Sequence, residues 1–297
     1  YYYVFQEKLM KNSKVFLNNK FLNLSEAKIS PLDRGFIFAD GVYELIPFFQ
    51  DKAFLLDKHL LRLNKNLSEM KIENIYSNDE WRSYINKLIS YYDYTNFYVY
   101  IQVSRGAPKH EEEVLRQHHY YNEMEPTIFM YVSEINLLPE DKIRKGFSCV
   151  TLDDLRWGMC NIKSISLAYN ALAKNYAKER EAFETVFVKK GIITEGSSSN
   201  IFIVKDNVFY TPQLNNYVLP GITRGYVIEE IKNLDYQIQE IDISIDLLEK
   251  ADEAFLTNST QFLVPISSLN KKIIGSGQAG KYSCELYEKF KKISRFS

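Results

Sequence analysis

The stretch RWGMCNIKS, residues 156–164, places one lysine, Lys163, directly after an isoleucine and before an alternating run that begins with a serine. An isolated lysine is most often a surface residue whose charge keeps the protein in solution. The same ammonium group forms Schiff bases and moves protons when it is buried beside a reactive partner. Which of the two roles Lys163 has depends on what the rest of the chain places around it.

The composition indicates an ordinary globular protein whose partners are small molecules. Hydrophobic residues make up 45% of the 297 positions and charged residues 25%, which suits one or two domains with a sizeable core. The net charge of -1 gives no basic field, so we expect neither nucleic acid nor membrane as a partner. No segment is apolar over the roughly 18 residues of a bilayer span. Three cysteines without C-x-x-C spacing predict free thiols in a reducing cytoplasm.

Hydrophobic periodicity predicts hairpins, helices and strands in the first half. Asn18-Asn19 and residues 50–52 lie between short apolar runs and predict the turns of two hairpins. The period then changes to that of a helix with Asp57 as its N-cap, and a second helix is expected over residues 78–91. Two strands are expected after it, at residues 96–106 and 127–132.

The residues between those two strands, 106–126, are charged and lack clear periodicity, which is typical of a surface loop. His118 and His119 are adjacent in this loop, so their side chains face apart, and with no third ligand in view we expect no metal site. Residues 135–146 contain a proline and mixed charges between strand patterns. They predict the connection between an N-terminal domain, residues 1–135, and a C-terminal domain, residues 136–297.

The second half mixes strands and helices in an irregular order. Helices are expected at residues 168–182, after residue 221 and near residues 283–293, with a meander of strands between residues 185 and 212. This order is neither the strict alternation of a doubly wound sheet nor the segregated pattern of a sandwich. We therefore expect a mixed fold, α+β or irregular α/β.

Three stretches of the second half offer groups that bind anions or hold a charge. LPGITRG, residues 219–225, leads into a helix whose free N–H groups and dipole suit a phosphate. TNST, residues 257–260, has the hydroxyls and backbone donors of an anion nest. In TEGSSSN, residues 194–200, Glu195 ends one strand and another resumes at once, so its carboxylate is expected to be fixed. Each stretch alone is also compatible with an ordinary turn.

Together these groups are what a pyridoxal phosphate enzyme needs. Such an enzyme uses a lysine that forms a Schiff base, a carboxylate that keeps the ring nitrogen protonated, and donors that hold the phosphate. The protonated ring withdraws electrons from the carbanion formed at the Cα of an amino acid. Lys163 would then be buried beside the cofactor, where it can also move the Cα proton.

The order of the motifs, over nearly the whole chain, resembles that of the fold-type IV, or class IV, pyridoxal phosphate aminotransferases. The chain looks closest to the D-amino acid aminotransferases and is also similar to the branched-chain aminotransferases. The matching stretches are DRGFIFADGVYE (33–44), HLLRL (59–63), CNIKS (160–164), TEGSSSN (194–200), LPGITR (219–224) and FLTNSTQFLVPI (255–266). The resemblance implies a smaller N-terminal α+β domain, a larger C-terminal domain that resembles a β-barrel with helices, and a homodimer.

The resemblance also implies roles for individual residues. Lys163 would be the catalytic Schiff-base lysine, Glu195 the partner of the pyridine nitrogen, and Arg62 a two-pronged phosphate ligand. The other cofactor-binding residues would be Ser198, Ser199, Asn200, Leu219, Ile222, Thr223, Asn258, Ser259 and Thr260. The substrate would be bound by Tyr43, Tyr100, Lys109 and His110. Taken alone, Arg62 is equally compatible with a helix-face arginine and Tyr43 with a core aromatic residue.

The substrate-binding positions depart from both subgroups. D-amino acid aminotransferases hold the substrate carboxylate with an Arg-x-His pair, whereas this chain has Lys109 and His110 in adjacent positions. A lysine presents a point charge where an arginine presents a fork, so the carboxylate would be bound differently. Branched-chain aminotransferases share Tyr100 but place an arginine where this chain has Gln102.

The expected activity is transfer of an amino group between an amino acid, D- or branched-chain, and a 2-keto acid through a lysine Schiff base. An alternative is 4-amino-4-deoxychorismate lyase, which shares the fold, the lysine and the cofactor but eliminates pyruvate. The CNIKS stretch favours a transaminase over this lyase. A non-catalytic binding protein of the same fold is disfavoured, because the lysine, the glutamate and the phosphate donors are all present.

Overall fold

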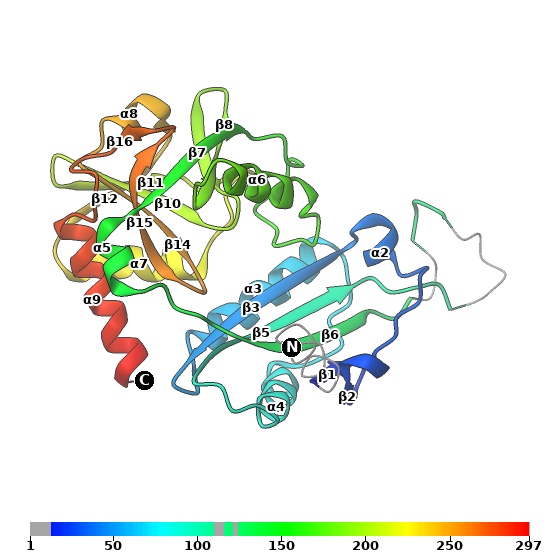
Figure 1. The fold of residues 1–297 in the computed structure, drawn as a ribbon. Helices are drawn as coiled ribbons and strands as arrows, with labels where there is room; N and C mark the ends of the chain where they lie inside the picture. Colours follow the sequence, from blue (N-terminus) through cyan, green and yellow to red (C-terminus); the bar gives the residue numbers. More distant parts are fainter. Residues whose placement is uncertain (1–12, 110–115, 121–123, 297) are drawn as a thin grey trace. The chain divides into compact units, whose positions relative to one another are not determined.

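The computed structural model describes residues 13–109, 116–120 and 124–296, and the chain divides into two compact units (Figure 1). The first unit comprises residues 1–135 and 162–166, and the second comprises residues 136–161 and 167–297. The short segment that contains Lys163 therefore belongs to the first unit, although the residues on both sides of it belong to the second.

The first unit is built on a six-stranded sheet in which all neighbouring strands are antiparallel, in the order β2-β1-β6-β5-β3-β4. The strands are β1 (Lys14–Leu17), β2 (Lys20–Asn23), β3 (Gly41–Phe49), β4 (Lys52–Ala53), β5 (Asn96–Ser104) and β6 (Thr127–Glu134). Both predicted hairpins are confirmed. Asn18, Asn19, Gln50 and Asp51 occupy their turns with positive φ, as two-residue hairpin turns require.

Two amphipathic helices cover one face of this sheet: α3 (Leu56–Glu69) contacts β3, and α4 (Asn78–Ile89) contacts β1 and β6. Shorter helical turns, η1 (Leu24–Glu26) and α2 (Arg34–Phe38), lie between β2 and β3. The expectation that Asp57 caps α3 is wrong. The helix begins two residues earlier than expected, at Leu56, after Leu55 in a left-handed conformation, and Asp57 in the first turn pairs with Arg82 of α4.

Alternate residues of the central strands point to opposite faces of the sheet. On the face covered by α3 and α4, the strand residues Val42, Ile46, Val99 and Ile101 are fully buried in the core. The opposite face carries partly exposed aromatic side chains, namely Tyr43, Tyr98, Tyr100, Phe129 and Tyr131. Two of the predicted substrate-binding residues therefore lie on this aromatic face.

The second unit contains a ten-stranded mixed sheet in the order β12-β11-β10-β14-β15-β7-β8-β9-β13, with β16 added to β15. The strands are β7 (Phe147–Asp153), β8 (Glu184–Lys189), β9 (Ile192–Gly196), β10 (Asn200–Lys205), β11 (Val208–Pro212), β12 (Gln237–Ile241), β13 (Ile243–Ser244), β14 (Glu253–Asn258), β15 (Phe262–Leu269) and β16 (Lys272–Ile273). β9 also contacts β10 and β11, so the sheet curves into a nearly closed, barrel-like form. The expected barrel-like C-terminal architecture is confirmed.

Five helices of the described residues belong to this unit: α5 (Glu140–Lys145), α6 (Ala168–Glu179), α7 (Ile222–Asn233), α8 (Ile245–Glu249) and α9 (Lys281–Phe296). α6 packs on β7 and β8, α7 on β12 and β14, and α9 on β14 and β15. The segment expected as a domain connection thus contains a short helix, α5. The mixed α+β class is confirmed. Across the described ranges, no helix combines the length and the apolar character that crossing a membrane demands.

Candidate active site

Lys163 lies beside the start of β3 in the first unit. The Tyr43 N–H donates to the Lys163 carbonyl oxygen (2.9 Å), and the Ile165 N–H donates to the Gly41 carbonyl oxygen (3.1 Å). This strand-like pairing aims the Lys163 side chain at Tyr43, where Nζ lies 4.1 Å from the ring centroid. Lys163 is only partly exposed, so the environment differs from that of a freely solvated surface lysine.

The aromatic face continues from Tyr43 across the sheet. The Tyr43 and Tyr100 rings stack with centroids 5.5 Å apart, and Tyr131 follows at 4.9 Å from Tyr100. The Tyr100 hydroxyl donates to Gln102 Oε1 (2.9 Å), and burial raises the pKa of this hydroxyl far above its ordinary value. The predicted residues Tyr43 and Tyr100 are therefore neighbours, and the face they form is aromatic with neutral hydrogen-bonding groups.

Glu44, next to Tyr43, points to the opposite face and is fully buried. Arg62 of α3 donates to it through Nε (2.6 Å to Oε1) and Nη2 (3.0 Å to Oε2), and His59 Nδ1 lies 2.8 Å from Oε2. Burial raises the pKa of the Glu44 carboxyl, but Arg62 and His59 lower it by more, to well below its usual range. The structure thus places Arg62, the predicted phosphate ligand, in a buried ion pair.

His59 completes this cluster as a neutral donor. Burial lowers the pKa of its imidazole, so at neutral pH the ring carries one proton, which the charged Glu44 holds on Nδ1. Nε2 is buried and has no hydrogen-bond partner among the described residues. The Glu44 carboxylate is therefore held from two sides by groups of one helix.

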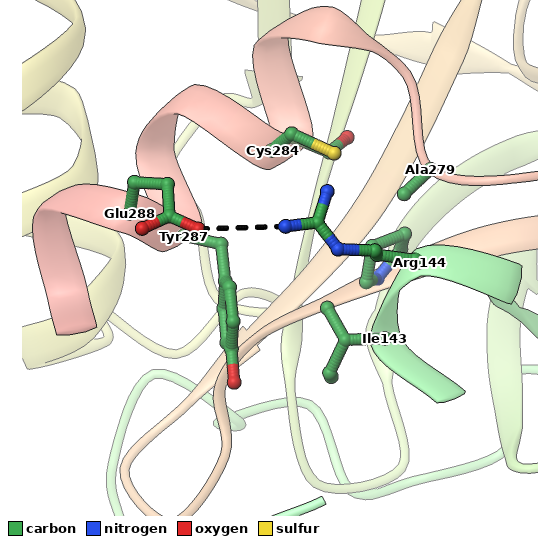
Figure 2. A pocket seen from close by; sticks show the side chains of 8 residues that line it. Ile143, Arg144, Ala279, Cys284, Tyr287 and Glu288 are labelled. Atoms are coloured by element: carbon green, nitrogen blue, oxygen red, sulfur yellow. Dashed lines mark ion pairs between the residues drawn. The ribbon is translucent and has the colours of Figure 1, made fainter. Parts of the chain in front are cut away.

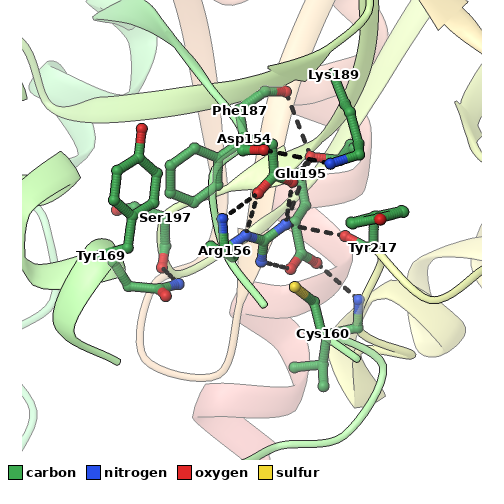
Figure 3. A network of polar contacts seen from close by, with 12 residues as sticks. Asp154, Arg156, Cys160, Tyr169, Phe187, Lys189, Glu195, Ser197 and Tyr217 are labelled. Carbon is green, nitrogen blue, oxygen red and sulfur yellow. Dashed lines mark hydrogen bonds and ion pairs between the residues drawn. The ribbon is translucent and has the colours of Figure 1, made fainter. Parts of the chain in front are cut away.

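In the second unit, a second buried cluster surrounds Glu195 (Figure 3). Arg156 donates to Asp154 through Nε (2.9 Å) and Nη2 (2.7 Å), and to Glu195 Oε1 through Nη1 (2.5 Å). Its guanidinium also lies over the Phe187 ring, 4.6 Å from the centroid, and donates to the Tyr217 carbonyl oxygen (2.9 Å). Burial raises the pKa of the Glu195 carboxyl, and Arg156 partly opposes that rise.

Asn200, at the start of β10, connects Glu195 to the loop before α7. Its Nδ2 donates to Glu195 Oε2 (3.2 Å) and to the Leu219 carbonyl oxygen (2.9 Å), and the Leu219 N–H donates to Glu195 Oε2 (2.8 Å). Gly221 packs so closely that a Cβ there would overlap Asn200 Oδ1. The predicted residues Glu195, Asn200 and Leu219 are therefore in direct contact.

The predicted phosphate-binding residues lie on either side of Asn200. α7 begins with Ile222 and Thr223 after Gly221, and no side chain caps its N-terminus. Across the β10–β14 pair, Asn200 lies opposite Thr257, whose hydroxyl is buried without a partner among the described residues. The three stretches that the sequence singled out in this half thus meet around one amide side chain.

The turn after β14 is organised by Asn258. Its Oδ1 accepts hydrogen bonds from the Thr260 N–H (3.0 Å), the Thr260 hydroxyl (3.1 Å) and the Gln261 N–H (2.8 Å). In this structure Asn258 is therefore an acceptor that shapes the turn, and the Thr260 hydroxyl donates to it. Ser259 lies between them and is partly exposed.

The loop that carries Lys109 is anchored by a third buried ion cluster. Asp40 accepts hydrogen bonds from Arg34 Nε (2.9 Å) and Arg105 Nε (2.8 Å), and Arg34 also donates to the His118 carbonyl oxygen (3.1 Å). Lys109 itself pairs with Glu125 at 2.8 Å on the surface. His110, the other predicted carboxylate ligand, lies outside the described residues.

Two further features have no predicted role in binding the cofactor or the substrate. Burial raises the pKa of the Cys160 thiol to about 11, so the thiol is protonated at neutral pH and donates to the Trp157 carbonyl oxygen. A small cavity of about 10 Å³ lies between α5 and α9, where Arg144 approaches Glu288 at 3.7 Å (Figure 2). This volume suits one water molecule, not an amino acid.

Comparison with known proteins identifies the family. The family model described as amino-transferase class IV matches residues 41–269. D-alanine aminotransferase of Bacillus licheniformis is 36% identical over 268 residues, which covers 90% of this chain and 92% of that protein. D-alanine aminotransferase of Staphylococcus aureus (strain N315) is also 36% identical, over 94% of this chain and 97% of its own length. The chain therefore belongs to the class IV aminotransferases.

Solved structures agree with this assignment. The branched-chain amino acid aminotransferase of T.th., solved with pyridoxamine 5'-phosphate, has a TM-score of 0.87 at 25% identity, over 96% of this chain and 95% of that one. The Escherichia coli branched-chain enzyme, 20% identical over 95% and 94%, shares the fold with a TM-score of 0.84. Class IV aminotransferases use pyridoxal phosphate, so the expected cofactor and the transaminase activity are confirmed, and the lyase alternative is not favoured.

In the clusters around Glu44 and Glu195, four charged or titratable residues had no role assigned from the sequence: Glu44, His59, Asp154 and Arg156. Glu44, His59 and Arg156 stand inside or beside the quoted motifs, but their partners are 15 to 39 positions away in the sequence. A charged residue within an apolar run could have indicated these ion pairs, because a charged side chain that becomes buried needs a partner of opposite charge. Both arginine–glutamate pairs follow this rule.

Glu44 makes the stability of the protein depend on pH at the acid end. Its pKa lies below the ordinary 4.5 in the folded protein, so the unfolded chain binds a proton that the folded chain does not. The free energy of unfolding therefore decreases as the pH falls below about 4.5. We expect Glu44→Gln to lower the stability at about pH 7 and to flatten this dependence, as measured by urea unfolding at several pH values.

Glu140→Gln is the matched control for that measurement. The Glu140 carboxyl also has a lowered pKa, about 2, because Lys291 and Arg144 donate hydrogen bonds to it, but Glu140 itself is 41% exposed, so solvent reaches both pairs. Added salt should reduce the contribution of Glu140 to the free energy of unfolding and leave the contribution of the buried Glu44 nearly unchanged. Identical pH dependence in the wild type and Glu44→Gln would contradict the role assigned to Glu44.

Proposed function

We propose that Lys163 holds pyridoxal phosphate covalently and that Glu195 binds the pyridine nitrogen of this cofactor, for transamination of D-amino acids with 2-keto acids. The observation that supports this most is the convergence on Asn200. In the second unit Asn200 touches the buried carboxylate of Glu195 and the loop that enters α7, and it pairs with the end of β14. The pyridinium nitrogen of pyridoxal phosphate is cationic and its phosphate is anionic. The Glu195 carboxylate suits the first, and the loop that enters α7 suits the second.

The residues present fit this cofactor. Three features lie next to Asn200: its strand partner Thr257 has a buried hydroxyl without a partner among the described residues, α7 begins without a side-chain cap from them, and Gly221 has no space for a Cβ. Donors of this kind suit phosphate oxygens, because the N-terminus of a helix stabilises an anion. We propose Ile222, Thr223, Ser259 and Thr260 as phosphate ligands, with Arg62 as a further one.

Bound pyridoxal phosphate supplies a protonated ring that accepts the electron pair released at the substrate Cα. Glu195 would keep the proton on the ring nitrogen, because a carboxylate that accepts a hydrogen bond from the protonated nitrogen favours the protonated form. Arg156 already neutralises Oε1 of Glu195, while Oε2 accepts from Asn200 and Leu219, so the carboxylate is fixed in position. We propose that Ser198 and Ser199 support the ring from the turn between Glu195 and Asn200.

Lys163 would act as the base that takes the proton from the substrate Cα. The Tyr43 ring beside Nζ restricts where the amine can move, and the hydrogen bond from the Tyr43 N–H fixes the backbone of Lys163. Tyr43 and Tyr100 are proposed to contact the substrate from the aromatic face. Lys109, with His110, is proposed to bind the substrate carboxylate, which would compete with Glu125 for the ammonium.

D-amino acids are the proposed substrates because D-alanine aminotransferases match this chain over nearly their whole length. The D-alanine aminotransferases of Bacillus licheniformis and Staphylococcus aureus (strain N315) are 36% identical to the chain, whereas the branched-chain enzyme of T.th. is 25% identical. The strand position where branched-chain enzymes have an arginine is Gln102, a neutral side chain that cannot form the two-pronged ion pair of an arginine with a carboxylate. The preference for D-substrates is therefore proposed from the similarity over the whole chain. It is not proposed from the residues that bind the substrate carboxylate, because these differ from those of both subgroups.

We further propose a homodimer located in the cytoplasm, with domains that correspond to residues 1–135 and 136–297, except that residues 162–166 belong to the first compact unit. Large hydrophobic side chains of the second unit, Leu155, Trp157 and Met159, are exposed within one loop, which suits a protein interface. All three cysteines are free thiols, as expected in a reducing compartment. Sedimentation of the purified protein at the mass of a single chain would contradict the dimer.

Replacing Lys163 tests the covalent link to the cofactor. We expect Lys163→Ala to lose the visible absorption of the lysine-bound cofactor and to reduce transamination by more than about 1000-fold, because the amine both binds and moves the proton. Lys87→Ala is a matched control, since Lys87 also lies over an aromatic ring of the first unit, that of Phe21 at 4.7 Å. An unchanged spectrum in Lys163→Ala would remove this lysine from the mechanism.

A half-reaction with single amino acids tests handedness. The holoenzyme, mixed with D-alanine in the absence of a keto acid, should lose its lysine-bound cofactor spectrum, and L-leucine at the same concentration should not change it. This result is expected because the chain is 36% identical to D-alanine aminotransferases over nearly their whole length. Reaction with L-leucine but not with D-alanine would instead make the protein an L-specific transaminase.

A further inference from the structure

Glu184, at the start of β8, is a fully buried carboxylate that has no role in the proposed mechanism. It accepts hydrogen bonds from the hydroxyls of three consecutive serines: Ser197 on Oε1, and Ser198 (3.0 Å) and Ser199 (3.3 Å) on Oε2. The Thr185 N–H adds a fourth hydrogen bond, to Oε1, at 3.0 Å. One carboxylate therefore gathers the side chains of an entire turn.

The charge of Glu184 is partly balanced by Lys174 of α6, whose Nζ lies 3.4 Å from Oε2. The Lys174 side chain is about half exposed, at 48%, so this pair is partly screened by solvent and contributes less than a buried pair. The hydroxyl donors are thus the principal partners of the buried carboxylate. Hydrogen bonds to a charged acceptor are stronger than neutral ones.

The same turn is also held through its backbone. The Gly196 N–H donates to the Ser199 carbonyl oxygen (2.7 Å), and the Ser197 N–H donates to the Thr185 carbonyl oxygen (2.9 Å). A Cβ on Gly196 would overlap Ser199 Oγ, so the backbone and the serine side chains are in close contact. The backbone bonds close the turn, and Glu184 fixes the directions in which its hydroxyls point.

This turn connects the two residues on which the ring-nitrogen site depends. Glu195 precedes it at the end of β9, and Asn200, which donates to Glu195 Oε2, follows it at the start of β10. Only four residues separate them. A change in the shape of the turn therefore shifts the Asn200 amide relative to the carboxylate.

We propose that Glu184 is a positioning residue, which sets the geometry of Glu195 toward the ring nitrogen by holding the hydroxyls of Ser197, Ser198 and Ser199. This inference rests on the proposed role of Glu195. A carboxylate is required because it accepts at both oxygens, whereas the amide of glutamine accepts at one and presents an N–H₂ group at the other. Glu184→Gln therefore disrupts either the Ser197 side or the Ser198 and Ser199 side.

The test is the ¹⁵N NMR signal of the ring nitrogen, in holoenzyme prepared with ¹⁵N-labelled pyridoxal phosphate, together with the half-reaction rate. We expect a protonated ring nitrogen in the wild type and a partly unprotonated one in Glu184→Gln, with a half-reaction about tenfold slower. Ser197→Ala removes one donor and keeps the buried charge. Ser197→Ala should shift the ¹⁵N signal in the same direction by a smaller amount. This variant replaces Glu184→Gln as the test if Glu184→Gln does not fold.

Glu253→Gln is the matched control in the same unit. The Glu253 carboxylate also accepts from a serine, through the Ser283 hydroxyl (2.7 Å) and N–H (2.8 Å), but at the start of β14, away from Asn200 and its Thr257 partner. A purely structural role of Glu184 would lower the melting temperature, as Glu253→Gln should, without changing the ring-nitrogen signal. That outcome would overturn the proposal.

Glu195→Gln separates this inference from the proposed function. If Glu195→Gln changes the ring-nitrogen signal and Glu184→Gln does not, only the positioning role is overturned. If Glu195→Gln leaves the signal unchanged, the proposed contact between Glu195 and the ring nitrogen fails, and the role of Glu184 fails with it.

Discussion

A charged group inside a protein must be paired, and this constraint determines the arrangement of the candidate site. The effective cost of burying an unpaired ion is several kcal/mol, and loss of one partner leaves the other uncompensated. Glu44 with Arg62, Asp154 with Arg156 and Glu195, and Asp40 with Arg34 and Arg105 all meet the constraint by hydrogen bonds from guanidinium groups. Because an arginine fork binds a carboxylate in a fixed plane, each pair also determines the orientation of its members.

The parts of the fold that the sequence predicted are those encoded by neighbouring residues. Asn18-Asn19 and Gln50-Asp51 predict their hairpins because asparagine and aspartate tolerate the positive φ of a two-residue turn. The same reasoning failed at α3, where an aspartate is the expected N-cap but Leu55 has the left-handed backbone that starts the helix. Motif stretches around Glu195, Leu219 and Thr257 were recognisable, and strand pairing explains why they meet at Asn200.

The sequence could not predict interactions between residues far apart in the chain. Arg156 stands in the loop stretch that contains Lys163, whereas its partner Glu195 is on β9, and no periodicity connects the two. Likewise, Glu184 follows a helix and begins a strand of apolar residues, so nothing local indicates three serines as its partners. Such partners are selected by the pairing of β8 with β9, which long-range packing decides.

The placement of residues 162–166 has a consequence for synthesis of the chain. These five residues pair with the beginning of β3, but they are made only after residues 136–161, which belong to the other unit. Residues 1–135 are therefore synthesised before the segment that completes their compact unit. Final ordering of the earlier half during translation must wait until part of the later half has emerged from the exit tunnel.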